Sequence, residues 1–232
     1  MKAVSSMATR RVLADLNEAA SAAGLPALDI ESVGGVDAAR RVADGEPFDL
    51  VFLALDALQR LAADGHVEAE SVTPLMLSQV AVGVPSGSDA PAVHDGGFAF
   101  PNASGMQAAL RGAARIGYST GPSGTALVSM IDDWGSRTSW GAAGAGPSGH
   151  PVARSLAEGE VDLGFQQLSE LVGQPGVRIL GVLPPDCAID TVFAGAVATA
   201  SSDPAAARET LAFLASDAAA PVKAAHSFTP AR

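Results

Sequence analysis

The chain has 232 residues, of which 48% are hydrophobic and 17% charged, a composition that excludes a disordered protein and suffices for one large domain or two small ones. Its single cysteine, Cys187, excludes an internal disulfide and a zinc site built from thiolates. The 14 basic and 25 acidic residues give a net charge of −11, which argues against nucleic acid and anionic membranes as partners. A small anionic ligand remains compatible, because a site can be locally positive inside an acidic protein.

The N-terminus leaves the cellular compartment open. Met1–Ser5 has the pattern of a strand, and neither the basic segment nor the apolar segment of a signal peptide precedes it. If Met1 is the native start, we expect a cytoplasmic protein; if a signal peptide has been removed, we expect a periplasmic one. No stretch approaches the roughly 20 uncharged apolar residues of a membrane helix, so we expect no membrane insertion.

Strand and helix patterns alternate along the chain, which predicts an α/β protein with a mainly parallel sheet. Short strands are expected at Met1–Ser5, Leu28–Val33, Asp49–Leu55, Arg115–Tyr118, Val161–Phe165 and Arg178–Leu183. Helices are expected at Ala8–Ala23, Asp37–Ala43, Ala57–Asp64, Ser123–Trp134, Pro151–Glu158, Asp203–Ala215 and Asp217–His226. The segment Ser136–Gly149 is rich in Gly, Ala and Ser and is expected to form a mobile loop.

Two longer strands, Leu77–Val84 and Asp190–Thr199, bracket the middle of the sequence. A chain that leaves one α/β lobe, builds a second and returns forms two lobes joined by two crossover strands. We therefore predict lobe 1 from residues 1–80 plus 195–232 and lobe 2 from residues 81–194. Ligands of open α/β sheets bind beyond the carboxyl ends of strands, so we expect an interlobe cleft that closes on a ligand by a hinge. We expect the protein to be a monomer.

The first two strand-to-helix junctions are rich in small and polar residues. The first, Ser5-Ser6-Met7-Ala8-Thr9-Arg10, places hydroxyls and N–H groups at a helix start, where they bind an anion or simply cap the helix. We expect Arg10 one turn into that helix, holding a carboxylate in two parallel bonds or remaining solvated. The second junction contains Gly34 and Gly35, which permit close approach of a ligand but also suit any tight turn.

Two later junctions carry further candidates. In Gly117–Gly124 a proline in the first helical turn and the hydroxyls of Thr120 and Ser123 make the best anion site of the sequence. No Gly-Lys-Ser/Thr follows, so this is no Walker A loop, which argues against phosphate transfer. The last junction places Gln166 and Gln167 after a strand, where their amides donate to and accept from a polar ligand or contact water.

Known catalytic motifs are missing from the sequence. It contains no His-x-x-x-His, His-Glu-x-x-His or Gly-x-Ser-x-Gly spacing, so we predict neither a metal site nor an α/β-hydrolase, and no cofactor.

These junctions resemble the class II solute-binding proteins, in the branch of the molybdate-binding proteins. The resemblance spans nearly the whole chain. Its marks are Ser5–Arg10, Asp37–Leu50, Gly117–Gly124, Gly159–Phe165 and Phe213–Ser216. It implies two α/β lobes with two crossover strands and the binding of a small anion by hydroxyls and backbone amides, with an ABC permease as partner if the protein is exported.

The resemblance also implies a role for individual residues. Ser6 matches the serine after the first strand, Ser123 matches an amide donor at a helix start, and Val152 matches the donor at the next helix. The turn at Gly34-Gly35 stands where relatives carry a second serine, and Gln167 stands where they carry a tyrosine. Together with Ser5, Arg10, Thr120, Gly124 and Gln166, these residues form the predicted ligand site. The two changed positions and Arg10 favour a small carboxylate over molybdate.

Relatives of this fold include an aconitate-isomerase type, which is the alternative function. Such an enzyme moves a proton along a small polycarboxylate, so it needs a base near the acidic C–H and donors on the developing enolate-like oxygens. His150 or Glu170 is the candidate base, and Ser123 and Gln167 are the candidate donors. A binding protein needs no base, and His150 would then merely precede a helix.

Overall fold

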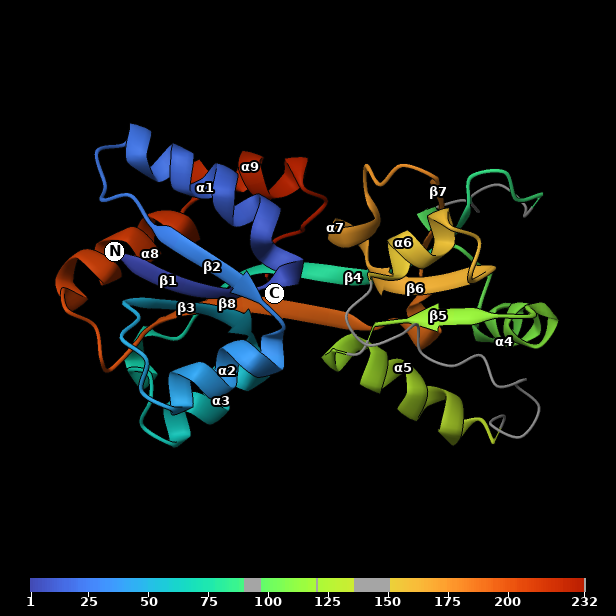
Figure 1. The fold of residues 1–232 in the computed structure, drawn as a ribbon, viewed down its shortest axis with the longest axis horizontal. Helices are drawn as coiled ribbons and strands as arrows, with labels where there is room; N and C mark the ends of the chain where they lie inside the picture. The colour runs from blue at the N-terminus through green and yellow to red at the C-terminus, as the bar shows by residue number, and fades with distance from the viewer. Residues whose placement is uncertain (90–96, 120, 136–150, 232) are drawn as a thin grey trace. The chain divides into compact units, whose positions relative to one another are not determined.

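The structure is a computed structural model that describes residues 1–89, 97–119, 121–135 and 151–231 (Figure 1). It consists of two compact units. Unit 1 comprises Met1–Ser78 and Thr191–Arg232, and unit 2 comprises Gln79–Asp190. The chain enters unit 2 within the long strand β4 (Thr73–Pro85) and returns at the start of β8 (Asp190–Val197). Ser136–Gly149, the expected mobile loop, lies outside the described residues.

Unit 1 contains a mixed sheet in the order β2-β1-β3-β8. Besides β8, its strands are β1 (Lys2–Ser6), β2 (Asp29–Val33) and β3 (Leu50–Ala54). β1 is parallel to both β2 and β3, whereas β8 is antiparallel to β3. The helices are α1 (Arg10–Ala22), α2 (Gly35–Ala43), α3 (Leu55–Ala63), α8 (Pro204–Ala215) and α9 (Ala220–Ala225), with single 3-10 turns at η1 (Met7–Thr9), η2 (Ala69–Ser71) and η6 (Asp217–Ala219).

Alternation along the strands of unit 1 gives the sheet two buried faces. Leu50 and Phe52 of β3 belong to the cluster that includes the apolar sides of α1 and α8. Val51 and Leu53, one residue on in each case, belong to the cluster that includes α2 and α3. Figure 1 shows α1 and α9 on one side of this sheet and α2 and α3 on the other. The continuous apolar run of β3 is therefore the sequence of a strand covered on both sides.

Unit 2 repeats this layering on a smaller sheet. Its strands are the second part of β4, β5 (Ile116–Tyr118), β6 (Leu163–Gln167) and β7 (Val177–Val182). β5 is parallel to β6, and β4 is antiparallel to both β6 and β7. The helices are α4 (Ala103–Gly112), α5 (Pro122–Asp133), α6 (Val152–Ala157) and α7 (Leu168–Leu171), with a 3-10 turn at η5 (Pro185–Cys187). α4 and α5 share one core cluster with β4 and β6, and α6 and α7 share the other.

Three expectations about the elements were wrong. The sheets are mixed and not mainly parallel, because the long strands β4 and β8 run antiparallel to their neighbours. The helix expected from Ala8 is a 3-10 turn followed by α1, and α4 and α7 have no counterpart among the expected helices. α4 buries only Met106 and Leu110, so its sequence carries a weak apolar pattern. Asn102 caps the start of this helix, and its Oδ1 accepts the Gly105 N–H at 3.0 Å.

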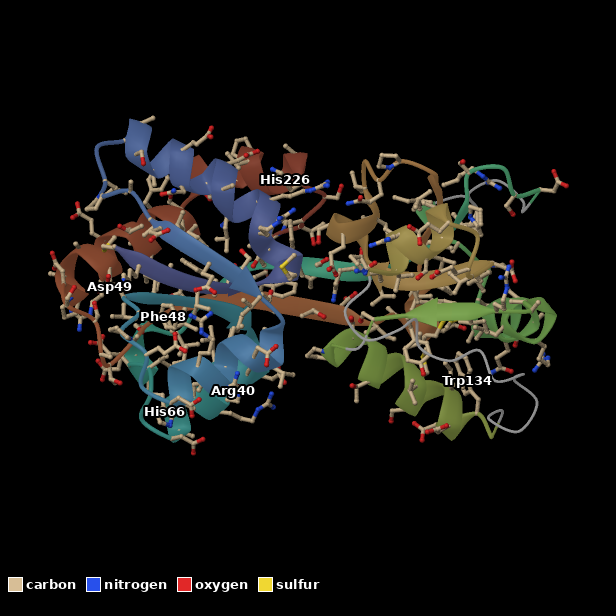
Figure 2. All side chains as sticks on the ribbon, in the orientation of Figure 1. Arg40, Phe48, Asp49, His66, Trp134 and His226 are labelled. Atoms are coloured by element: carbon tan, nitrogen blue, oxygen red, sulfur yellow. The ribbon has the colours of Figure 1, made fainter. Side chains whose placement is uncertain are left out.

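A buried carboxylate, Asp49 (labelled in Figure 2), connects three segments of unit 1. One oxygen accepts the Lys2 N–H of β1 at 2.9 Å. The other accepts the Ser201 Oγ at 2.8 Å and the Ser202 N–H at 2.9 Å, from the turn after β8. Burial by itself raises the pKa of Asp49, but the hydrogen bonds from Lys2, Ser201 and Ser202 outweigh it and bring the pKa below the usual value. The ionised form therefore stabilises the fold.

We expect Asp49→Asn to destabilise the protein by about 1–3 kcal/mol, because both carboxylate oxygens accept hydrogen bonds and an amide must turn its NH₂ toward one donor. A depressed folded pKa contributes stability above the unfolded value of about 4 and loses it as the pH falls through the folded pKa. Denaturant unfolding between pH 7 and pH 2 should show a smaller decrease in the free energy of unfolding for the variant than for the unchanged protein. Asp64→Asn, at an exposed residue of the same unit, is the control. If Asp49→Asn loses as much stability at acid pH as the unchanged protein, the ionised Asp49 does not stabilise the fold.

Candidate functional site

Hydroxyl side chains gather at the carboxyl ends of β1 and β2. The Ser5 Oγ lies 2.8 Å from the Ser32 Oγ, because the two residues face each other in the parallel register. The Thr9 Oγ1 donates to the Ser6 carbonyl at 3.1 Å and lies 3.5 Å from the Ser6 Oγ. We call Ser5, Ser6, Thr9 and Ser32 the unit 1 cluster. Ser5 and Thr9 are fully buried and Ser6 nearly so, which fixes the positions of their hydroxyls.

The alternative interpretation of these hydroxyls, simple capping of a helix, is not what the structure shows. Ser6 precedes η1 and Thr9 precedes α1, and neither side chain makes a capping hydrogen bond. Arg10 is the first residue of α1 and directly follows the 3-10 turn η1, so it lies one helical turn after the end of β1, and it is exposed. A guanidinium at this position stands one residue from the Thr9 hydroxyl, at the edge of the unit 1 cluster.

The glycine pair adds backbone to this edge. Gly34 precedes α2 and Gly35 is its first residue, with no side-chain cap at the helix start. A β-carbon at Gly35 would lie 3.7 Å from the Ser6 Cβ, so the start of α2 packs against the end of β1. The start of α2, where N–H groups point out of the helix, therefore lies beside Ser6.

A second polar group lies at the carboxyl ends of β5 and β6 in unit 2. The Ser119 Oγ lies 3.0 Å from the Ser123 Oγ in the first turn of α5. Because β5 and β6 are parallel, with Tyr118 opposite Phe165, Ser119 and the end of β6 share one edge of the sheet. Ser119, Ser123, Gln166 and Gln167 form the unit 2 cluster. Of the predicted residues, Thr120 lies outside the described residues.

Gly124 allows the loop after β5 to approach the start of α5. A β-carbon at Gly124 would lie 1.6 Å from the Ser119 carbonyl oxygen. Backbone in contact at this distance cannot move aside without displacing the loop, so a glycine is needed here for packing. The residue thus has a structural reason to be a glycine, alongside its predicted place near a ligand.

The expectation that the two glutamines follow a strand was wrong. Gln166 and Gln167 are the last two residues of β6, and both are buried. The Gln166 Oε1 accepts the Ala153 N–H at 3.3 Å, in the first turn of α6. Val152 begins α6, and its side chain is buried in the unit 2 core, so only its backbone is available as the predicted donor. Gln166 therefore connects the end of β6 to the start of α6.

Glu170 in α7, one of the two predicted candidate bases, has a raised pKa. Burial raises its pKa to about 7, although a hydrogen bond from the Gln166 side chain acts in the opposite direction. The residue as a whole is partly exposed, while its carboxyl is desolvated. A carboxyl with a pKa near 7 exchanges protons readily at neutral pH. The other candidate base, His150, lies outside the described residues.

Three hydroxyls of these clusters, Thr9, Ser32 and Ser119, belong to the junctions singled out in the sequence but were not among the predicted ligand residues. Ser32 could have been found from the parallel register, which sets it opposite Ser5, but that register is not visible in one sequence. Among the residues with described positions, no group of three or more His, Cys, Asp or Glu side chains is arranged to hold a metal ion. In the same residues, no helix has the length and apolar character needed to cross a membrane.

Comparison with known proteins shows the family. The model of a family described as bacterial extracellular solute-binding protein matches residues 1–229. The chain belongs to this family. An aconitate isomerase from Pseudomonas sp is 33% identical to this solute-binding protein over 217 residues, which are 92% of this chain and 80% of the relative.

Solved structures agree with the fold. The periplasmic molybdate-binding protein of Azotobacter vinelandii has a TM-score of 0.77 at 18% identity, and both chains are covered completely. Peb3 from Campylobacter jejuni has a TM-score of 0.69 at 12% identity, with 98% of each chain covered. The two-lobed class II fold and the likeness to the molybdate-binding branch, predicted from the sequence, are confirmed.

We expect Gly124→Ala to lower the stability by about 1–3 kcal/mol, because its methyl group would overlap the Ser119 carbonyl. Gly121→Ala, in the same loop but with nothing within 4 Å of the added carbon, should change the stability by no more than about 0.5 kcal/mol. Urea unfolding of both variants measures the difference. Equal stability of the two variants would show that the loop moves aside easily.

Proposed function

We propose that this protein binds a small anion, an oxyanion or a small carboxylate, and that the unit 1 cluster and the unit 2 cluster are its candidate donor groups. The single observation that supports this most is that hydroxyls gather at the strand ends of unit 1 without capping the helices that follow. Hydroxyls and helix N–H groups donate to an anion without carrying a full charge, and the helix dipole adds a favourable potential. Arg10 then supplies a planar pair of donors that suits a carboxylate.

The solved neighbours hold chemically different solutes and do not select one for this chain. The Azotobacter neighbour is named for molybdate, another solved neighbour, PEB3, holds L-phospholactate, and a third, HitA from Pseudomonas aeruginosa, holds iron. These structures are less than 25% identical to this chain, so they share its fold only. Should the protein be exported, an ABC permease is the partner that a solute-binding protein of this type would serve.

The test is a calorimetric titration of the whole protein with a panel of anions: molybdate, sulfate, and di- and tricarboxylates. Ser6→Ala and Ser123→Ala should each weaken anion binding, because each removes one hydroxyl donor. Arg10→Ala should weaken a carboxylate by about 1.5–3 kcal/mol, the usual contribution of a hydrogen bond to a charged group.

Arg60→Ala is the matched control for Arg10→Ala, since Arg60 is an exposed arginine of α3 that pairs with Asp56. Its affinity for the anion should equal that of the unchanged protein. The proposal fails if no anion of the panel binds, or if Ser6→Ala and Ser123→Ala leave the affinity unaltered.

Turnover of the bound acid is a second candidate function, favoured by Glu170 and by the 33% identity to an aconitate isomerase. In a 1,3-proton shift, a base takes a proton from one carbon, the double bond moves, and the proton is delivered to the carbon two positions along. No atom is gained or lost. Glu170 is the described residue suited to carry the proton, and Ser123 and Gln167 would donate to the oxygens on which negative charge develops.

If the protein is such an isomerase, cis-aconitate incubated with it in heavy water should yield the trans isomer or exchange deuterium. The rate constant kcat/KM should rise with pH through about 7, because the base acts as the ionised carboxylate. Glu170→Gln keeps the size and an acceptor for Gln166, so it should lower turnover at least about 10²-fold while aconitate still binds. Binding without isomerisation or exchange would leave the protein a solute-binding protein only.

A further inference from the structure

Two large apolar side chains are exposed among the residues that the structure describes. Met7 has 44% of its surface accessible and Val36 has 71%. Single exposed apolar residues are common on proteins and need no explanation when they are scattered. These two are not scattered, because they lie at the same edge of one sheet.

Met7 and Val36 both lie close to Ser6 of the unit 1 cluster. Met7 directly follows Ser6 at the end of β1, and Val36 is the second residue of α2, which follows β2. β1 and β2 are parallel neighbours, with Ser6 opposite Val33, so their carboxyl ends lie side by side. The contact between Gly35 and Ser6 brings the start of α2 against the end of β1.

Exposed apolar side chains next to hydrogen-bond donors suit an organic acid better than an inorganic oxyanion. An inorganic tetrahedral oxyanion presents only oxygen to its site, so apolar neighbours would remove water from that oxygen and return no hydrogen bond. An organic acid presents carboxylate oxygens together with a chain of C–H groups, and that chain gains from contact with apolar side chains.

We infer that Met7 and Val36 determine specificity, contacting the hydrocarbon part of a bound organic acid while Ser6, the member of the unit 1 cluster at the end of β1, holds one of its carboxylates. This inference rests on the proposed function, since it concerns the same site and selects the class of ligand. It assigns the selectivity to side chains that make no hydrogen bond to the ligand.

The experiment compares two classes of probe on the whole protein. Succinate and tricarballylate are the organic acids, and molybdate and sulfate are the inorganic anions. Met7→Gln and Val36→Thr preserve size while making each side chain polar, and because both are exposed the variants should keep the melting temperature of the parent. Each change should weaken the best organic acid about 3- to 10-fold, the loss expected for one or two methylene-sized contacts, and alter the inorganic anions less than about 2-fold.

Val72→Thr is the matched control, because it makes the same substitution at a partly buried valine next to η2 and outside the strand ends. It should leave the ratio of organic to inorganic affinity unchanged. The inference is overturned if the parent protein binds only inorganic anions, or if Met7→Gln and Val36→Thr weaken both classes equally, which would indicate a role in another contact. In both of those cases the proposed anion binding survives, whereas binding of no probe at all would remove both.

Discussion

Parallel pairing at two places in the sheets is the constraint on which the candidate site depends. β1 with β2, and β5 with β6, end side by side, and each of these pairs brings polar residues from distant parts of the sequence to one edge. Ser5 meets Ser32 only because the register aligns them, and the unit 2 hydroxyls reach the edge where β6 ends for the same reason. The antiparallel strands β4 and β8 serve a different purpose, since they carry the chain between the units. The buried, apolar strands hold these edges rigid, so the hydroxyls are positioned before any ligand arrives.

The chemistry of both clusters is polar but almost uncharged, and this reconciles an anion with a protein of net charge −11. Long-range attraction cannot concentrate an anion near such a protein; recognition must come from short-range donors. Hydroxyls and helix N–H groups act only at contact distance, where the water between ligand and protein has been removed. Arg10 is the cation nearest to the unit 1 cluster along the chain, and it is exposed to solvent. Asp49, although charged and buried, lies at the opposite ends of these strands and stabilises the fold instead.

The sequence predicts most of the elements because they follow a simple pattern of burial. β3 is apolar throughout since both of its faces are covered, and helices such as α1 show a clear apolar stripe. The prediction fails where tertiary contacts set the boundary: β6 extends through Gln166 and Gln167 because β4 pairs with them, although glutamines suggested a loop. It also fails for α4, whose apolar face is small. Ser6, Ser123 and the glycine pair were predicted from local composition, whereas the pairing of Ser32 with Ser5 and of Ser119 with Ser123 depends on strand register and on a helix start that local composition does not show.

The difference between holding an acid and converting it comes down to one proton carrier, and the structure constrains how that carrier is oriented. A backbone N–H can only donate, so the Ala153 N–H fixes the Gln166 Oε1 toward α6. The NH₂ of the same amide must then face Glu170, which receives a hydrogen bond and is held with an oxygen toward Gln166. Burial raises the pKa of Glu170 and this hydrogen bond lowers it, and the balance of the two leaves a carboxyl that is ionised and protonated in similar amounts at neutral pH. If the protein turns over a bound acid, as proposed for its second candidate function, Glu170 is the described residue whose pKa suits a proton carrier.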